Sequence, residues 1–188
     1  MADSVLPIET AMELDVATEL RAFLIGDIRG YTRFALEHGD AAAAQLAKTF
    51  EAVVAKGIGL RSGQVVETRG DQVVGSFTSA RLALRAAVAL QIRFAQMMDA
   101  NPSLHLQVGI GVDAGEVVPV DDGYRGRALN LAARLCDQAR AGEVLASEAV
   151  IHLAGRMDDL EYLEGRELHL KGFAEPVRAI QVVAPDWG

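Results

Sequence analysis

Hydrophobic positions in the first third of the chain show two different spacings. A short, continuous apolar run at 22–25 is typical of a buried strand, which we place within 21–28. Over 40–59, apolar residues recur every three or four positions, as on an amphipathic helix, with Asp40 as its expected N-cap. The pattern therefore predicts a strand followed by a long helix.

The middle of the chain changes from extended to helical patterning. Two extended runs, 64–68 and 72–77, are joined around Gly70-Asp71, a pair suited to a tight hairpin turn. Helical spacing returns over 79–98, where Ser79 is the expected cap. We expect a β-hairpin followed by a second long helix.

The remaining part of the chain continues the alternation. Its expected elements are strands at 104–112 and 116–120, a helix over 129–140, and strand-like runs at 160–170 and 177–183. Because hairpins are interleaved with helices, we predict a mixed sheet flanked by helices and an α+β fold class rather than a doubly wound one. Residues 1–19 are expected to form a lead-in, 20–184 a single domain and 185–188 a tail.

Composition and charge restrict the classes of protein that remain. The formal net charge of −8 over 188 residues argues against a bulk nucleic-acid binder. Cys136 is the single cysteine, so an intramolecular disulfide and a four-thiolate zinc site are both excluded, and a reducing cytoplasm is the expected location. No stretch reaches the roughly 20 apolar residues of a membrane span, and residues 1–20 lack the basic start of a secretory signal.

Two acidic residues stand where predicted strands end. Asp27 closes the first apolar strand, and Asp71 lies at the tip of the predicted hairpin. If the two strands are neighbours, the carboxylates converge, and they repel each other unless a cation or a proton lies between them. Carboxylate oxygens suit Mg²⁺ or Mn²⁺, which bring substrate phosphates with them. The residues alone leave a second interpretation open, in which Asp71 forms the turn and Asp27 caps the strand.

A third cluster lies on the helix predicted over 129–140. Asn130 and Arg134 are four positions apart, so they share one helix face at a separation of about 6 Å. An amide and a guanidinium in this arrangement can hold a sugar oxygen and a phosphate oxygen. Spacing alone also allows a solvated helix face with no ligand.

Six sequence blocks occur in an order that resembles the catalytic domain of class III nucleotidyl (adenylate and guanylate) cyclases. The resemblance covers about residues 20–184 and is carried by FLIGDIRGYTRF (23–34), ETRGDQVVGSF (67–77), LQVGIGVDAGEVV (106–118), YRGRALNLAARL (124–135), AGEVLASE (141–148) and LKGFAEPVRA (170–179). Any one block could occur by chance, but six in this order are specific.

The resemblance implies a ferredoxin-like domain that acts as a homodimer with sites shared between chains. Asp27 and Asp71 match the family's metal-binding aspartates, with the backbone carbonyl of Ile28 as a further ligand for two Mg²⁺ or Mn²⁺ ions per site. The partner chain's copies of Asn130 and Arg134 match the residues that orient the ribose and stabilise the transition state. Lys171 matches a lysine near the triphosphate. The implied reaction converts a purine nucleoside triphosphate, GTP or ATP, to its 3′,5′-cyclic monophosphate and pyrophosphate.

Three positions depart from the adenylate cyclase pattern. Glu67 and Gly123 stand where ATP-using members carry a lysine and an aspartate or threonine. A carboxylate at the first position is the guanylate cyclase choice, because it accepts from the guanine N1 and amino hydrogens. Arg69, where the family has an apolar residue, shares the strand face of Glu67 and Asp71 and could neutralise the first or compete with a metal for the second.

Other functions remain to be weighed against a cyclase. A degenerate cyclase homology domain that binds nucleotide or dimerises as a regulatory module is the main alternative, and a regulatory domain could accompany this segment in a longer parent protein. An RNA-binding ferredoxin-like domain would need exposed aromatics and a basic face, whereas aromatics are only 5% here. The Gly-Gly-acid-Glu-Phe turn of diguanylate cyclases is absent at 70–72.

Overall fold

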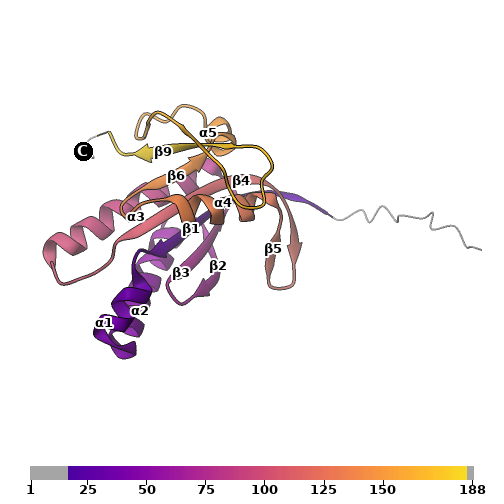
Figure 1. The fold of residues 1–188 in the computed structure, drawn as a ribbon. Helices are drawn as coiled ribbons and strands as arrows, with labels where there is room; N and C mark the ends of the chain where they lie inside the picture. The colour runs from indigo at the N-terminus through magenta and orange to yellow at the C-terminus, as the bar shows by residue number, and fades with distance from the viewer. Residues whose placement is uncertain (1–16, 186–188) are drawn as a thin grey trace, which may run out of the picture.

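The structure of the protein is a computed structural model, which describes residues 17–185. A mixed sheet of nine strands in this part of the chain has helices on both faces (Figure 1). The elements in chain order are β1 (Glu19–Ile28), α1 (Tyr31–His38), α2 (Asp40–Gly59), β2 (Gln64–Arg69), β3 (Gln72–Phe77), α3 (Ala80–Ala100), β4 (Val108–Val120), β5 (Gly123–Arg125), α4 (Arg127–Gln138), β6 (Val144–Ser147), α5 (Glu148–Ala154), β7 (Glu161–Tyr162), β8 (Arg166–Leu168) and β9 (Val177–Val183).

The strand order confirms the predicted mixed sheet and α+β class. It runs β2-β3-β1-β4-β6-β9-β7, with β5 paired to β4 and β8 paired to β9. The β4–β6 pair is parallel, whereas β1 pairs antiparallel with both β3 and β4. Strand β1 therefore lies in the middle of the sheet, between the hairpin β2–β3 and the long strand β4.

Period-two alternation along β1 divides the core between two layers. Ala22, Leu24 and Ile28 pack with α2 and α3 on one face, whereas Phe23 and Ile25 pack with α4 on the other. Asp27 has the parity of Phe23 and Ile25, so the strand itself directs this carboxylate toward the α4 face.

Both long helices were predicted at nearly their observed bounds. Helix α2 spans the predicted 40–59, and α3 begins one residue after Ser79 and ends before Asn101. The expected cap at Asp40 is wrong: Gly39 occupies the N-cap position and Asp40 is the first helical residue. Ser79 is the N-cap of α3, but its side chain makes no capping hydrogen bond.

The predicted strands are confirmed in part. The hairpin of β2 and β3 turns at Gly70-Asp71 as expected, and Gly70 has a φ of 58°. The separate strands expected at 104–112 and 116–120 are one strand, β4, because its pairing with β1 continues through Gly115. The run 160–170 contains only the two short strands β7 and β8.

Several elements and boundaries were not predicted. The α4 helix covers 127–138 rather than 129–140, and α1, α5, β5 and β6 had no sequence prediction. The predicted lead-in meets β1 at Glu19. Residues 1–16 of that lead-in and 186–188 of the predicted tail lie outside the described residues.

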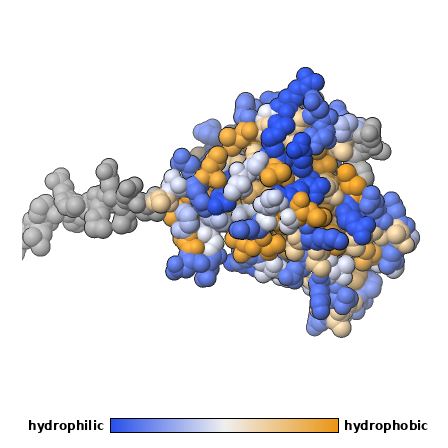
Figure 2. All heavy atoms as spheres, turned by 180° about the vertical axis from the view of Figure 1, so that it is seen from behind, coloured by the Kyte–Doolittle hydropathy of each residue, from blue (hydrophilic) through white to orange (hydrophobic). Residues whose placement is uncertain are grey.

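The surface mixes polar and apolar side chains, as the view from behind in Figure 2 shows. The large apolar residues exposed on the described surface are Leu20, Leu36, Leu60, Val65, Val120, Leu153 and Leu163. Among residues 17–185, no helix has the length and apolar character needed to cross a membrane.

Candidate active site

Asp27 and Asp71 lie at the same end of the sheet, as predicted for neighbouring strands. Asp27 is the penultimate residue of β1 and is paired with Gln72, the first residue of β3. The backbone N–H of Ile28 donates to the carbonyl of Asp71 over 3.1 Å. This hydrogen bond attaches the hairpin turn to the end of β1, so both carboxylates and the Ile28 backbone belong to one small region.

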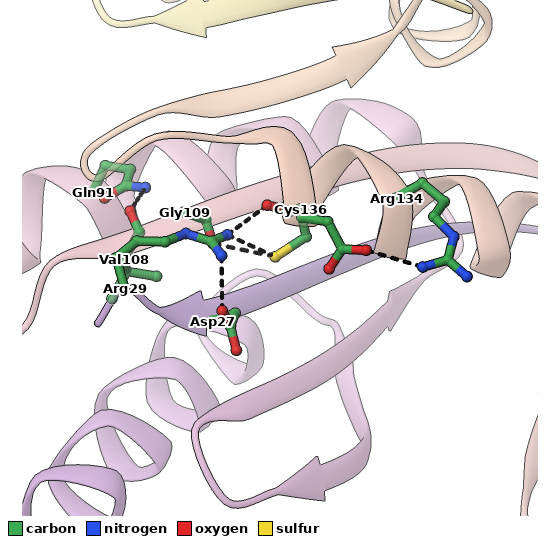
Figure 3. Close-up of polar contacts among 8 residues, drawn as sticks. Asp27, Arg29, Gln91, Val108, Gly109, Arg134 and Cys136 are labelled. Atoms are coloured by element: carbon green, nitrogen blue, oxygen red, sulfur yellow. Dashed lines mark hydrogen bonds and ion pairs between the residues drawn. The ribbon is translucent and has the colours of Figure 1, made fainter. Parts of the chain in front are cut away.

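Arg29 joins Asp27 to the end of α4. Its Nη1 donates to Oδ2 of Asp27 over 2.8 Å, and its Nη2 donates to the backbone carbonyl of Cys136 over 2.5 Å (Figure 3). The Asp27 side chain is 22% exposed and that of Arg29 is 24% exposed. The ion pair is therefore only partly screened by solvent.

The Asp27 carboxyl has an unusual proton affinity. Its pKa is raised from 3.8 to about 6, chiefly by burial; the Arg29 guanidinium opposes this rise, and the carboxylates of Asp71 and Asp137 add to it. Three carboxylates therefore lie near one another at the end of the sheet, where Asp27 is largely shielded from water. A divalent cation would relieve this repulsion.

Asn130 and Arg134 line a hollow beside α4. Its volume is about 1060 Å³, and Lys171 from the loop before β9 lines it too, together with Gln72 at the start of β3. Arg134 is ion-paired to Asp137 over 3.0 Å. Among the described residues, neither Asn130 nor Arg134 makes a hydrogen bond or ion pair with Asp27 or Asp71. Gln72 is paired with Asp27 and follows Asp71 in the chain, so the hollow begins beside the end of β1.

Packing of the 170–177 loop against α4 places Lys171 at the hollow. Leu170 is buried in a cluster with Leu131 and Leu135 of α4. The guanidinium of Arg127 lies over the ring of Phe173, 5.0 Å from its centroid. Arg127, Arg134 and Lys171 bring donors suited to phosphate oxygens to the hollow, beside the carboxylates of Asp137 and Glu175.

The residues predicted to read the base lie on the two neighbouring hairpins. Glu67 is on β2 and Gly123 is at the start of β5, where a Cβ would lie 3.0 Å from Cγ1 of Val66. Arg69 forms an ion pair with Glu67 over 2.5 Å, which confirms that the two share a strand face. The Glu67 side chain is 42% exposed, so it remains accessible to a ligand.

The donor set at the end of β1 fits a hard divalent cation. Within the described range 17–185, no group of three or more His, Cys, Asp or Glu side chains could hold a metal ion. Two carboxylates and one backbone carbonyl form a sparse set, which suits Mg²⁺ or Mn²⁺ because these ions retain water and substrate phosphate oxygens. Arg29 engages Oδ2 of Asp27, one of its two carboxylate oxygens.

Two polar residues of this region were missed in the sequence. Arg29 is two positions after Asp27, and period two along a strand would have placed both on one face. Asp137 is three positions after Arg134, a spacing at which side chains on a helix meet. Local spacing was therefore sufficient to find both ion pairs.

The sequence of the chain was compared with those of known proteins and protein families. No protein-family model matches the chain. An uncharacterised protein of Mycobacterium tuberculosis is 32% identical over 174 residues, covering 84% of this chain and 31% of that protein. A putative adenylate cyclase of Rhizobium meliloti is 26% identical over 163 residues, covering 86% of this chain and 28% of that protein. This chain thus spans about a third of the length of these curated relatives.

Solved structures of cyclases have a similar fold. The crystal structure of an adenylate/guanylate cyclase/hydrolase from Silicibacter pomeroyi matches with a TM-score of 0.79 and 28% sequence identity, over 89% of this chain and 98% of that one. The ferredoxin-like mixed sheet expected from the sequence blocks is therefore confirmed. The chain therefore has the fold of adenylate and guanylate cyclase catalytic domains, and a putative adenylate cyclase is among its sequence relatives.

Proposed function

We propose that the chain is the catalytic domain of a metal-dependent nucleotidyl cyclase. The observation that supports this most directly is the pair Asp27 and Asp71, joined through the Ile28–Asp71 hydrogen bond at the end of the central strand. In the proposed reaction, the ribose 3′-oxygen bonds to the α-phosphorus, the bond to the β-phosphate breaks, and pyrophosphate leaves. The proton of the 3′-hydroxyl passes to water.

The proposed site contains residues from two copies of the chain. Asp27, Asp71 and the Ile28 carbonyl of one copy would hold the cations, and the hollow of the other copy would receive the nucleotide. Within that hollow, Asn130 orients the ribose, Arg134 stabilises charge on the transferring phosphoryl group, and Lys171 binds the triphosphate. The proposed site therefore requires a homodimer, in which each copy supplies one of the two sets, which we call half-sites.

Two divalent cations per site, Mg²⁺ or Mn²⁺, supply Lewis-acid activation of the 3′-hydroxyl and neutralise the triphosphate when bound. The chain contributes a desolvated carboxylate, Asp27, whose charge is offset by Arg29. Cytoplasm is the proposed location, in keeping with a buried free thiol at Cys136. Because the chain spans a third of its curated relatives, we include a regulatory domain among the proposed partners.

The alternative is a regulatory module that binds nucleotide without turning it over. The Arg69–Glu67 ion pair favours this alternative, because a Glu67 carboxylate that is already bound to Arg69 is a weaker acceptor for hydrogen bonds from a base. Glu67 and Gly123 are nevertheless proposed to face the base, with GTP slightly ahead of ATP. Gly123 contributes no side chain, so Glu67 alone would provide the preference.

Product analysis separates the two functions. The purified protein is incubated with each nucleoside triphosphate and Mn²⁺, and the products are identified by mass spectrometry. We expect a cyclic monophosphate and pyrophosphate in equal amounts, and chelation of the metal should abolish both. Asp71→Asn should lower the rate by about a hundredfold or more, because it removes an anionic ligand.

Folding of the variant must be checked in the same experiment. Asp71→Asn should keep the parent's melting temperature or exceed it, because it also relieves carboxylate repulsion. If the folded variant cyclises nucleotide as fast as the parent, Asp71 is only a turn residue and the proposed metal site is wrong. Nucleotide binding without any product would favour the regulatory module.

A further inference from the structure

Arg29 occupies a position between the two half-sites of one chain. It follows directly on β1, and its backbone N–H donates to the carbonyl of Gln107 over 2.6 Å, which continues the strand pairing beyond Ile28. Its guanidinium contacts Asp27 with one nitrogen and the Cys136 carbonyl with the other. Figure 3 shows this side chain reaching from the end of β1 to the last turn of α4.

Two glycines of β4 leave room for the Arg29 side chain and for helix α4. A Cβ on Gly109 would clash with Nε and Nη2 of Arg29, and one on Gly111 would clash with the α4 backbone at Ala132 and Cys136. Helix α4 and Arg29 thus both rest directly on the backbone of β4. The Cys136 thiol also faces this point, 3.4 Å from the Gly109 carbonyl.

Charge explains why a cation is placed here. Cys136 lies in the last turn of α4, where the helix dipole is negative, and its carbonyl accepts from the amide of Ala139 over 3.1 Å as well as from Arg29. Asp27, Asp71 and Asp137 add carboxylates to the same region. Arg29 is the cation that bonds both to Asp27 and to the helix end, and its planar guanidinium permits two separate contacts.

We propose that Arg29 is a positioning residue that joins the two half-sites of a chain, holding Asp27 for one shared active site and the α4 helix, with Asn130 and Arg134, for the other. This inference rests on the proposed function, in which each site takes its metal ligands from one copy and its ribose and phosphate ligands from the other. In such a dimer, every Arg29 acts on both active sites.

The structural part of the proposal is testable without catalysis. Hydrogen exchange is measured on the metal-free parent, on Arg29→Met and on Arg29→Lys. The amide of Ala139, which bonds to the carbonyls of Leu135 and Cys136 in the last turn of α4, should exchange about tenfold faster in both variants. Lysine keeps the charge but cannot make both contacts, so recovery in Arg29→Lys would overturn the joining role.

A matched control separates this effect from general loss of charge. Arg33 on α1 has a side chain that is 80% exposed, and its only ion pair among the described residues is with Glu37 at 4.0 Å. Arg33→Met should leave the exchange of Ala139 unchanged. Equal acceleration in Arg33→Met, or unchanged exchange in Arg29→Met, would overturn the proposal.

The functional part uses a heterodimer with a single intact site. An Arg134→Ala chain supplies Asp27 to this site, and an Asp27→Ala chain supplies Asn130 and Arg134. Arg29→Met is placed in one chain or in the other, and turnover is measured against Mn²⁺ concentration. We expect about a tenfold loss in either placement, the scale typical of residues that orient ligands. Added Mn²⁺ should recover part of the loss only when the chain that supplies Asp27 is changed.

The outcomes distinguish the inference from the function on which it rests. An inactive parent heterodimer would contradict the shared site itself, and hydrogen exchange would still decide whether Arg29 holds α4. If that heterodimer is active, loss of turnover in only one placement would show that Arg29 serves one half-site, which overturns the joining role. Loss in both placements supports it.

Discussion

Asp113 is a buried carboxylate outside the proposed machinery. It is 2% exposed on β4 and accepts a hydrogen bond from the hydroxyl of Ser147, which also caps α5. Glu143, which is 5% exposed, has a very different environment, because Arg166 contacts both of its oxygens, at 2.8 and 3.0 Å. Burial raises the pKa of Asp113 from 3.8 to about 6, although Ser147 and Arg127 partly oppose this.

Removal of this charge should stabilise the fold in a pH-dependent way. Between about pH 4 and pH 6 the unfolded chain loses the Asp113 proton while the folded chain retains it, so the carboxyl destabilises the folded state as the pH rises. Asp113→Asn should therefore raise the free energy of unfolding by about 1–3 kcal/mol at pH 7.5, and this gain should disappear at pH 4. Urea denaturation at both pH values measures it.

A surface carboxylate provides the control for this measurement. Asp122→Asn removes an exposed charge and should change the free energy of unfolding by less than about 0.5 kcal/mol at either pH. If Asp113→Asn destabilises the protein equally at both pH values, the residue acts through its hydrogen bond and not through the cost of its buried charge.

Base choice is also decided by single residues. Ionised Glu67 presents only acceptors, so it should favour guanine, which offers two donors, over adenine, which offers one. The exposed ion pair with Arg69 weakens this preference without contributing much stability. Glu67→Lys should lower the GTP-to-ATP ratio of turnover, and Arg69→Ala should raise it, within the range of about 1–3 kcal/mol that buried unpaired polar groups cost.

Turnover of both nucleotides at several concentrations checks this prediction. A ratio that is the same in the parent, Glu67→Lys and Arg69→Ala would show that Glu67 does not read the base. An equal fold-loss of both activities in Glu67→Lys, which leaves the ratio unchanged, would assign Glu67 a structural role in β2.

Among the elements, those with strong periodicity could be predicted and those defined by tertiary contacts could not. Helices α2 and α3 have clear apolar faces, and the β2–β3 turn has a characteristic dipeptide. Strand β6 has four residues, and β5 exists only through its pairing with β4. Short elements of this kind depend on neighbours that are distant in sequence, which local patterns do not reveal.

Among the candidate site residues too, some could be predicted from local sequence and others depend on tertiary contacts. The convergence of Asp27 and Asp71 was expected if their strands were neighbours, and the pairing of β1 with β3 meets this condition. The position of the α4 hollow relative to these residues depends on how α4 packs on Gly111 of β4, which local spacing does not reveal. Family resemblance, rather than local spacing, supplied Lys171, whose loop has no regular structure near the hollow.

Close packing of α4 on β4 gives a prediction about these two elements. Gly111→Ala would place a methyl group against the α4 backbone, 2.9 Å from the Cα of Cys136 and closer still to the Ala132 carbonyl. Because backbone cannot yield as a flexible side chain does, the free energy of unfolding should fall by about 3 kcal/mol or more. Gly59→Ala, at the end of α2 with no atom within 4 Å of the new methyl, should be neutral or stabilising.

Urea denaturation of both variants measures the difference. Equal stability of the Gly111→Ala and Gly59→Ala proteins would show that α4 can move away from β4 at little cost. The position of Asn130 and Arg134 relative to Asp27 would then not be a fixed property of the chain.

At the scale of the whole molecule, the two sets of candidate site residues lie on different elements of one domain. Asp27 and Asp71 are at the end of β1, and Asn130, Arg134 and Lys171 line the hollow beside α4. In a dimer with two-fold symmetry, the two aspartates of each copy would lie beside the α4 hollow of the other copy. The dimer is therefore part of the proposed chemistry and not only a means of stabilisation.

Complementation between inactive chains tests this shared site most directly. Asp27→Ala and Arg134→Ala homodimers should each be inactive, because every site in them lacks one essential group. Heterodimers isolated with two different affinity tags should recover up to half of the parent's rate of cyclic nucleotide formation, because one of their two sites is intact. Isolated heterodimers that show no recovery would contradict a site shared between two chains.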